Sequence, residues 1–241
     1  MGLYREQGIV LRSYKLGETD RILHILSQGR GKVRAVAKGV RKPGSRFGGR
    51  LEPFGHVDLQ LYESRSGLDI INQADLITPF HEVRQDWTLS ACGSAIVEAA
   101  DRIVQEHERF QSLYLLVLDG LRLLSRHPAQ PAVVLDAFLL RLASIAGYHA
   151  SLDACASCGA PGHHPVFHLD LGGLLCERCA PAGSQPMAEG VLAGLHALAS
   201  SDWGVAEDLD PRARRLSGAL VASYLTHHLG RPLAAWDLVP R

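Results

Sequence analysis

The stretch HVDLQLYE (residues 56–63) alternates apolar and polar side chains with a period of two. Successive side chains of an extended chain point to opposite faces, so Val57, Leu59 and Leu61 share the face away from Asp58 and Gln60. The stretch therefore predicts a β-strand with one face in a core and the other face toward solvent.

The stretch belongs to one of five β-prone runs, each bounded by glycine or by a polar turn. These runs are residues 5–16, 20–28, 31–39, 49–64 and 68–77, and the quoted stretch lies in the fourth. Five short strands without an intervening helix predict a small antiparallel barrel, for which the oligonucleotide/oligosaccharide-binding (OB) fold is the natural candidate. A five-stranded SH3-like barrel fits the pattern nearly as well, and periodicity alone does not choose between them.

After Pro79 the apolar residues recur at helical spacing, which predicts helices within residues 80–108, 109–126, 131–148, 187–201 and 211–230. Pro131 suits a first helical turn, and Gly230 with Pro232 ends the last helix. We therefore expect an α+β multidomain chain. Its parts are an OB domain at 1–79, a helical domain at 80–150 with 186–241, and an inserted cysteine element at 151–185.

The inserted element reads CASCGAPGHHPVFHLDLGGLLCERC (155–179) and holds two Cys-x-x-Cys pairs separated by seventeen residues. Four thiolates from two such turns form a tetrahedral shell that selects Zn²⁺, or less often iron. The spacing predicts a structural zinc held by Cys155, Cys158, Cys176 and Cys179. Ligation by a nearby histidine (163, 164 or 168) and reduced thiols without metal remain alternatives.

Nothing in the sequence predicts catalysis. Four cysteines close the metal shell, whereas a catalytic zinc keeps a position open for water. The motifs of zinc deaminases, H-E-x-x-H metalloproteases, P-loop nucleotide hydrolases and nucleophile elbows are missing from the chain. The fifth cysteine, Cys92, lies in an apolar helical run and is expected to be a buried small hydrophobe.

The formal net charge is zero, but the charge is segregated along the chain. Residues 21–51 contain nine lysines and arginines and no acidic residue, and the remaining residues sum to −9. A local excess of cations attracts polyanions even when the whole-chain charge cancels. Cytoplasmic location is expected, because the N-terminus lacks a signal-peptide core and no apolar run is long enough to cross a membrane.

Within this basic segment, strand alternation over residues 31–39 places Lys32, Arg34 and Lys38 on an outward face. Pro43 and three glycines (44, 48 and 49) then predict a mobile loop that carries four more cations beside the barrel. The candidate contacts to a nucleic-acid backbone are Arg30, Lys32, Arg34, Lys38, Arg41, Lys42, Arg46 and Arg50. Phe47 has two interpretations: stacking on an unpaired base, or packing against the barrel.

The order of barrel, helices and inserted four-cysteine element resembles the bacterial DNA repair and recombination mediator family RecO over essentially the whole chain. The residues that carry the resemblance are Gly8, Val10 and Leu11, then Tyr14, Glu18 and Asp20, KGVR (38–41), LEPF (51–54) and GRPLAAW (230–236). The resemblance implies binding of single- and double-stranded DNA, strand annealing, and loading of RecA with RecR onto DNA coated by single-strand binding protein (SSB). It also implies a nucleoid-associated, non-enzymatic protein with RecR and SSB as partners.

Two other functions remain open at this point. The chain could be a pure adaptor whose basic loop binds an acidic partner protein, with zinc holding its fold. It could also be a zinc-dependent enzyme acting on nucleic acid, although the closed cysteine shell argues against this.

Overall fold

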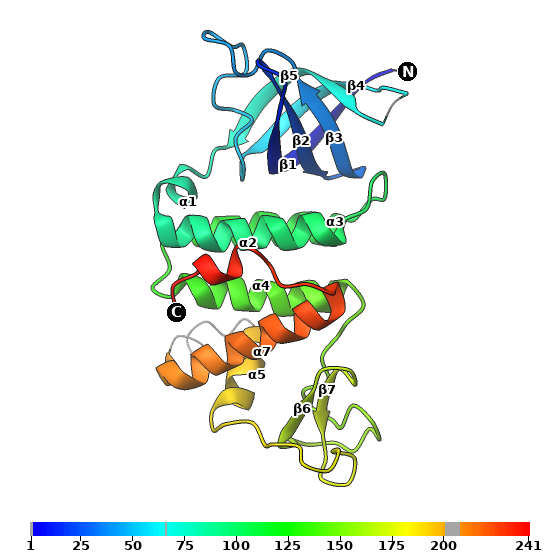
Figure 1. Cartoon of the computed structure of the whole chain (residues 1–241), viewed down its shortest axis with the longest axis vertical. Helices are drawn as coiled ribbons and strands as arrows, with labels where there is room; N and C mark the ends of the chain where they lie inside the picture. The colour runs from blue at the N-terminus through cyan, green and yellow to red at the C-terminus, as the bar shows by residue number, and fades with distance from the viewer. Residues whose placement is uncertain (1, 66, 201–207) are drawn as a thin grey trace. The chain divides into compact units, whose positions relative to one another are not determined.

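The structure, a computed structural model, describes residues 2–65, 67–200 and 208–241. The chain separates into two compact units, residues 1–128 and 129–241 (Figure 1). The first unit holds a β-barrel and three helices, and the second holds the cysteine element and the remaining helices. The three-part division expected from the sequence stays a prediction.

The barrel has five strands: β1 (Leu3–Leu16), β2 (Asp20–Ser27), β3 (Gly31–Ala37), β4 (His56–Tyr62) and β5 (Asp69–Thr78). They close in the order β1-β2-β3-β5-β4, and all neighbours are antiparallel except β3 and β5. This closed arrangement is the OB fold, so the predicted fold class is confirmed and the SH3-like alternative is not adopted. The closure leaves no free sheet edge.

Apolar side chains at alternate positions of the strands fill the barrel interior, as the sequence predicted. Val57, Leu59 and Leu61 of β4 are each at most 1% exposed, and they meet Val33 and Ala35 of β3 in one core cluster. The outward positions between them are polar or partly exposed. Apolar burial on this scale is the main driving force for closing the barrel.

The connection from β3 to β4, residues 38–55, is a succession of turns that is anchored in the barrel core. Phe47 is 1% exposed and Leu51 is 2% exposed, and both belong to the core cluster, with Val40 packed against it. The packing interpretation of Phe47 is therefore confirmed and base stacking on it is wrong. The expected strand at 49–64 begins only at His56, because turns occupy the residues before it.

Three helices complete the first unit: α1 (His81–Gln85), α2 (Trp87–Ile103) and α3 (Gln111–Leu124). The single helical region expected at 80–108 is broken at Asp86, whose side chain accepts a hydrogen bond of 2.9 Å from the Leu89 amide as the cap of α2. The apolar stripe predicted for α3 is buried at Leu113, Val117 and Leu121. Helix α3 contacts the barrel through Tyr114, whose hydroxyl lies 2.7 Å from Nε2 of the buried His56.

The turn between β2 and β3 passes close to the connection between α2 and α3. Gly31 has a φ of 65°, and a Cβ at this position would lie 1.9 Å from the carbonyl oxygen of Glu108. The amide of Lys32 donates to the carbonyl of Gln105 at 3.0 Å. Only glycine satisfies both the positive φ and this close approach.

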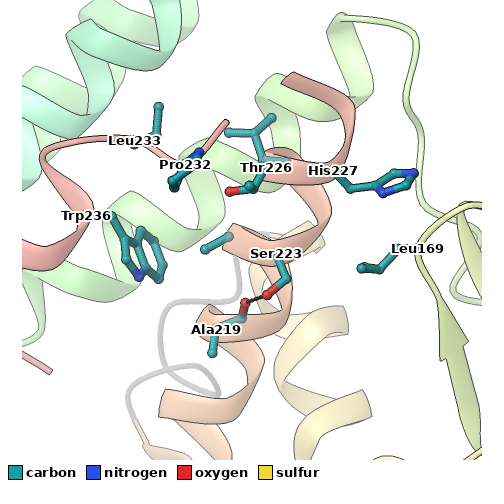
Figure 2. Close-up of a pocket in the computed structure, with 10 residues that line it drawn as sticks. Leu169, Ala219, Ser223, Thr226, His227, Pro232, Leu233 and Trp236 are labelled. Carbon is teal, nitrogen blue, oxygen red and sulfur yellow. Dashed lines mark hydrogen bonds between the residues drawn. The ribbon is translucent and has the colours of Figure 1, made fainter. Parts of the chain in front are cut away.

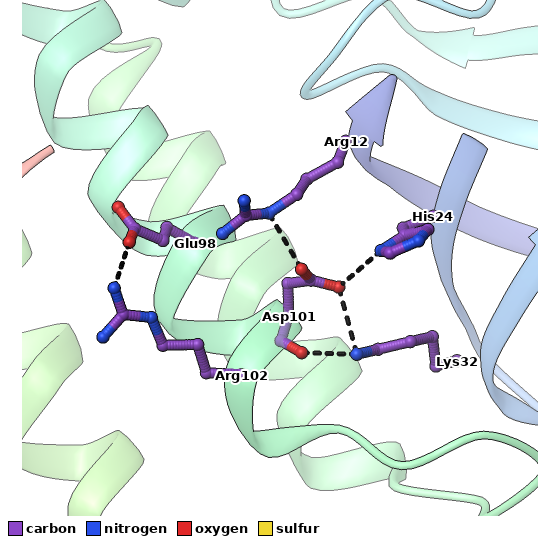
Figure 3. Close-up of polar contacts among 6 residues, drawn as sticks. All are labelled: Arg12, His24, Lys32, Glu98, Asp101 and Arg102. Atoms are coloured by element: carbon purple, nitrogen blue, oxygen red, sulfur yellow. Dashed lines mark hydrogen bonds and ion pairs between the residues drawn. The ribbon is translucent and has the colours of Figure 1, made fainter. Parts of the chain in front are cut away.

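One carboxylate joins three barrel strands to α2 (Figure 3). The side chain of Asp101 lies 2.8 Å from Nε of Arg12 on β1, 3.1 Å from Nδ1 of His24 on β2 and 3.1 Å from Nζ of Lys32 on β3. Lys32 also donates to the Asp101 backbone carbonyl. Burial raises the pKa of Asp101, but the hydrogen bond from His24 and the charge of Lys32 outweigh burial, and the pKa lies below its ordinary 3.8.

The second unit contains α4 (Pro131–Ile145), β6 (Val166–His168), β7 (Gly173–Leu175), α5 (Val191–Ser200), α7 (Pro211–Leu229) and the 3₁₀ turn η1 (Trp236–Leu238). Helix α7 packs on α4 and α5. The β6–β7 hairpin lies between the two cysteine pairs and was not predicted, because three-residue strands are too short to show a period. Ser201, at the end of one predicted helix, lies outside the described residues.

Both ends of α7 carry capping residues that can be recognised in the sequence, Asp210 at the start and Gly230 at the end. Asp210 accepts hydrogen bonds from the Arg212 and Ala213 amides, and Gly230 ends the helix with a φ of 75°. The buried carboxylate of Asp136 on α4 accepts two hydrogen bonds from the Arg241 guanidinium, at 2.8 and 2.9 Å.

No helix among residues 2–65, 67–200 and 208–241 is long and apolar enough to span a membrane.

Replacing Asp101 by Asn should destabilise the first unit by about 1–3 kcal/mol, because three cationic or hydrogen-bonding groups lose a buried charged partner. Native-state hydrogen exchange of the β1–β3 amides at pH 7 measures this change. Because the folded pKa is lowered, the contribution of Asp101 is fully present above the ordinary Asp pKa and is lost as the pH falls through the folded value.

The matched control is Asp119→Asn on α3, which removes an exposed carboxylate 3.2 Å from Arg122. Its effect should stay below about 0.5 kcal/mol. Equal destabilisation by the two variants at pH 7 would show that Asp101 does not hold the barrel to α2.

Candidate functional site

The fold divides the basic residues of segment 21–51 into two groups. In the first group, each cation has a carboxylate partner from outside the segment. These ion pairs are Arg21–Glu52 at 3.3 Å, Arg30–Glu63 at 3.2 Å, Lys32–Asp101 at 3.1 Å and Arg34–Glu106 at 3.4 Å. The acidic residues absent from the segment in sequence are therefore brought to it by the fold.

This pairing changes the outward face that the sequence predicted for β3. The Lys32 side chain is only 15% exposed and points to Asp101 of α2, as Figure 3 shows. Arg34 stays 42% exposed but shares its charge with Glu106. Lys38 lies beyond the end of β3, in the turn that follows it. The barrel wall therefore presents less free charge than strand alternation alone predicted.

The second group lies in the turns after β3, and we call it the free-cation group: Lys38, Arg41, Lys42, Arg46 and Arg50. All five side chains are exposed. Within the part of the chain that the structure describes, no carboxylate lies within 4.0 Å of any of their charged nitrogens. The backbone hydrogen bond of Gly39 lowers the pKa of the Asp20 carboxylate, and the charges of Lys38 and Lys42 add to this effect without forming an ion pair with it.

Backbone contacts hold the free-cation group in place. The Arg41 guanidinium donates a hydrogen bond to the Glu18 carbonyl at 2.9 Å, and the backbone amide of Arg41 donates one to the Thr19 carbonyl, also at 2.9 Å. The Gly39 amide donates to Asp20 at 2.8 Å, and this hydrogen bond lowers the pKa of Asp20. The turn after β3 is thus fixed to the turn between β1 and β2.

The other end of the group is fixed by Phe47. The Arg46 guanidinium lies over the Phe47 ring at 4.9 Å from its centroid, and Arg50 donates to the Arg46 carbonyl at 2.7 Å. The expected mobile loop is therefore anchored near its start, through Gly39 and Arg41, and again at Phe47. Cations on an anchored backbone lose less conformational entropy on binding than cations on an unanchored one.

The four cysteines predicted as metal ligands lie together in the second unit. The sulfurs of Cys155, Cys158, Cys176 and Cys179 are all within 4.8 Å of one another, and those of Cys158 and Cys176 are 3.9 Å apart. A tetrahedral zinc with Zn–S bonds of about 2.3 Å separates its sulfurs by about 3.8 Å. The arrangement therefore fits a single metal ion, and structural zinc is compatible with it.

Backbone amides also favour a thiolate in this cluster. The Cys176 amide donates a hydrogen bond to the Cys155 sulfur at 3.4 Å, and the Cys158 amide donates a second one. Together they lower the pKa of Cys155 to about 6. The Cys179 thiol instead donates hydrogen bonds to the Cys176 and Cys158 sulfurs, and these raise the pKa of Cys179 to about 12. Four adjacent sulfurs do not all ionise without a cation, which a metal ion between them would supply.

The nearby histidines are occupied elsewhere. His164 contacts the Ala160 carbonyl at 2.9 Å, His163 packs edge-on against His196 at 5.2 Å, and His168 lies 3.9 Å from Asp170. Among the described residues, the metal-compatible cluster contains the four cysteines and none of these rings. Histidine ligation is therefore not supported by the geometry.

The second unit also has an apolar cavity of about 490 Å³ (Figure 2). Ala219, Ser223 and Thr226 of α7 form one side, and Leu233 with Trp236 of the C-terminal segment forms the other. The cavity contains no cluster of titratable side chains that would predict catalysis.

One cation near the basic segment was missed by the charge count. Arg12 lies on β1, outside residues 21–51, and its side chain is 34% exposed beside His24. A strict two-residue period would have placed Arg12 on the same face as Val10 of the barrel core, and the β-bulge between these two residues turns Arg12 outward beside His24. Its pairing with Asp101, 89 positions along the chain, has no local sequence signal.

Comparison with known proteins covers both units. A family model described as "Recombination protein O N terminal" matches residues 1–80, and one described as "Recombination protein O C terminal" matches residues 84–237. Proteins named "DNA repair protein RecO" are similar over the full length. The one from Nocardioides sp. is 46% identical over 99% of this chain and 100% of its own length. Those from Frankia casuarinae and Thermobifida fusca are 43% and 42% identical over 100% of both chains.

Purified protein should contain one zinc ion per chain by elemental analysis, and Cys155→Ser should lose it. Loss of the metal removes folding free energy, so amide exchange at residues 150–185 should rise by about tenfold or more. Exchange in the barrel should not change, because the barrel belongs to the other unit.

Cys92→Ser serves as the control, since Cys92 is buried in α2 and is not a member of the four-cysteine cluster. This variant should keep its zinc. A stoichiometry of zero in the wild-type protein, or full zinc content in Cys155→Ser, contradicts the assignment.

Proposed function

The chain belongs to the recombination protein O (RecO) family, and from this premise we propose that it acts in DNA repair and recombination as a non-catalytic DNA-binding mediator. Membership of the family supports a role in DNA repair and recombination. We further propose which residues contact DNA, which proteins bind the chain and what the metal does.

The free-cation group is the single observation that carries DNA binding. Five exposed cations without carboxylate partners lie on one anchored connection of an OB barrel, a fold that commonly binds oligonucleotides. Each cation that contacts a phosphate releases a condensed counterion, so binding should tolerate sequence and weaken steeply with salt. The paired cations Arg30, Lys32 and Arg34 should contribute less, since a phosphate must first displace a carboxylate.

The family resemblance supports the mediator role itself. We propose that the protein binds single- and double-stranded DNA, anneals complementary strands, and with RecR helps to load RecA onto SSB-coated DNA. The four-cysteine cluster would hold zinc in a structural role, because its closed thiolate shell leaves no position for a substrate.

Replacing Lys38, Arg41, Lys42 and Arg46 together by Ala should weaken single-stranded DNA binding and flatten its salt dependence. The slope of log K against log[salt] should become less negative by about 0.7 for each lost contact, or about 2.8 in total. Fluorescence anisotropy with a labelled oligonucleotide at several salt concentrations measures both quantities.

A control with the same loss of charge replaces four exposed arginines elsewhere in the first unit, Arg65, Arg109, Arg122 and Arg126, by Ala. Its salt slope should stay near that of the wild type. If the slope is unchanged in the first variant, or falls equally in both, the free-cation group is not the DNA contact.

A pure adaptor is the second candidate, and the apolar cavity on α7 favours a protein-binding role for the second unit. The two functions are compatible, and we propose RecR and SSB as the protein partners. Calorimetric titration of each partner into the full chain tests this, and no binding by either would remove the mediator role. Failure to bind bare single-stranded DNA at low salt would leave the adaptor role alone.

A further inference from the structure

The outer face of β1–β3 carries an aromatic ring beside the cations described above. The strand register aligns Tyr14 of β1 with Ile22 of β2 and Val36 of β3 in one row across the sheet. The adjacent row aligns Arg12, His24 and Arg34. In an OB barrel, the face around strands 2 and 3 is a common site of oligonucleotide binding.

Tyr14 is both exposed and oriented. Its side chain is 43% exposed. The ring meets His24 edge-on, with 5.1 Å between ring centroids and 61° between planes. His24 is itself fixed by Asp101 at 3.1 Å. The chain of contacts from Asp101 through His24 therefore sets the orientation of Tyr14 before any ligand binds.

Cations flank this row on both sides. Arg34 lies two positions before Val36 on β3, about 7 Å away along the strand, and Lys38 lies two positions after it, in the turn that follows β3. Both side chains are exposed. A nucleotide whose base lies on Tyr14 would thus have a phosphate near the unpaired Lys38, whereas Arg34 on the other side shares its charge with Glu106.

Other aromatic residues fit this role less well. Phe47 is 1% exposed and fills the barrel core. Tyr62 is as exposed as Tyr14, but it lies on β4 opposite Leu3 and Ile70, outside the rows that carry Arg34 and Lys38. Stacking on an aromatic ring is available to every base, so it suits a surface that binds single strands without sequence preference.

We infer that Tyr14, oriented by His24, is the platform on which an unpaired base of single-stranded DNA stacks, next to the phosphate contacts of the free-cation group. This inference rests on the proposed DNA binding and adds to it a contact that duplex DNA, with its bases already stacked, does not make. Tyr14 would therefore contribute to the binding of single strands alone, and the free cations to the binding of both forms.

The test compares Tyr14→Ala with the matched control Tyr62→Ala. Binding of each variant to oligo(dT) and to an abasic strand of equal length is measured by fluorescence anisotropy at constant salt. Tyr14→Ala should weaken oligo(dT) binding about tenfold and leave abasic binding unchanged within about twofold. Tyr14→Phe should restore oligo(dT) binding, since the ring and not the hydroxyl makes the contact. Tyr62→Ala should bind as the wild type does.

The outcomes separate this inference from the proposed function. Wild-type protein that binds neither strand at low salt would overturn both. Wild-type binding with a steep salt dependence, but no loss in Tyr14→Ala, would overturn the stacking role alone. Equal losses on oligo(dT) and on the abasic strand, or equal losses in the two alanine variants, would also overturn it.

Discussion

The carboxylate of Asp101 is the constraint on which the first unit depends. It lies among Arg12, His24 and Lys32, one residue from each of three adjacent barrel strands, and so fixes α2 against the barrel. A charged group at such a buried position is stable only with partners, and the three strands supply them. The same contact orients His24, and through it the exposed Tyr14 ring.

This arrangement also decides which cations remain free. Acidic residues from the turns that flank β4, from the end of α2 and from the α2–α3 connection pair with the cations on β2, on β3 and on the β2–β3 turn. The turns after β3 receive no such partners among the described residues, and Phe47 and Leu51 anchor these turns in the barrel core. A neutral protein thereby presents one local surface suited to a phosphate backbone. The four-cysteine cluster, which is compatible with a structural zinc, is confined to the other unit.

Local patterns in the sequence predicted much of this. The period of two at residues 56–63 predicted a buried strand face, and the spacing of the four cysteines predicted their cluster. Features that depend on distant contacts were not predictable. Lys32 looked free because Asp101 lies 69 positions away, and Phe47 looked like part of a loop because glycines and cations surround it. Neither residue has neighbours in sequence that reveal its partners in space.

The central claim is that the fold separates paired cations from free ones and that the free ones bind DNA. It is tested most directly by two double variants with equal loss of charge, Arg41→Ala with Lys42→Ala and Arg30→Ala with Arg34→Ala. In single-stranded DNA binding, the first pair should make the salt slope less negative by about 1.4, and the second should change it by less than about 0.7. Equal changes in the two variants, or a larger change in the second, would contradict the account.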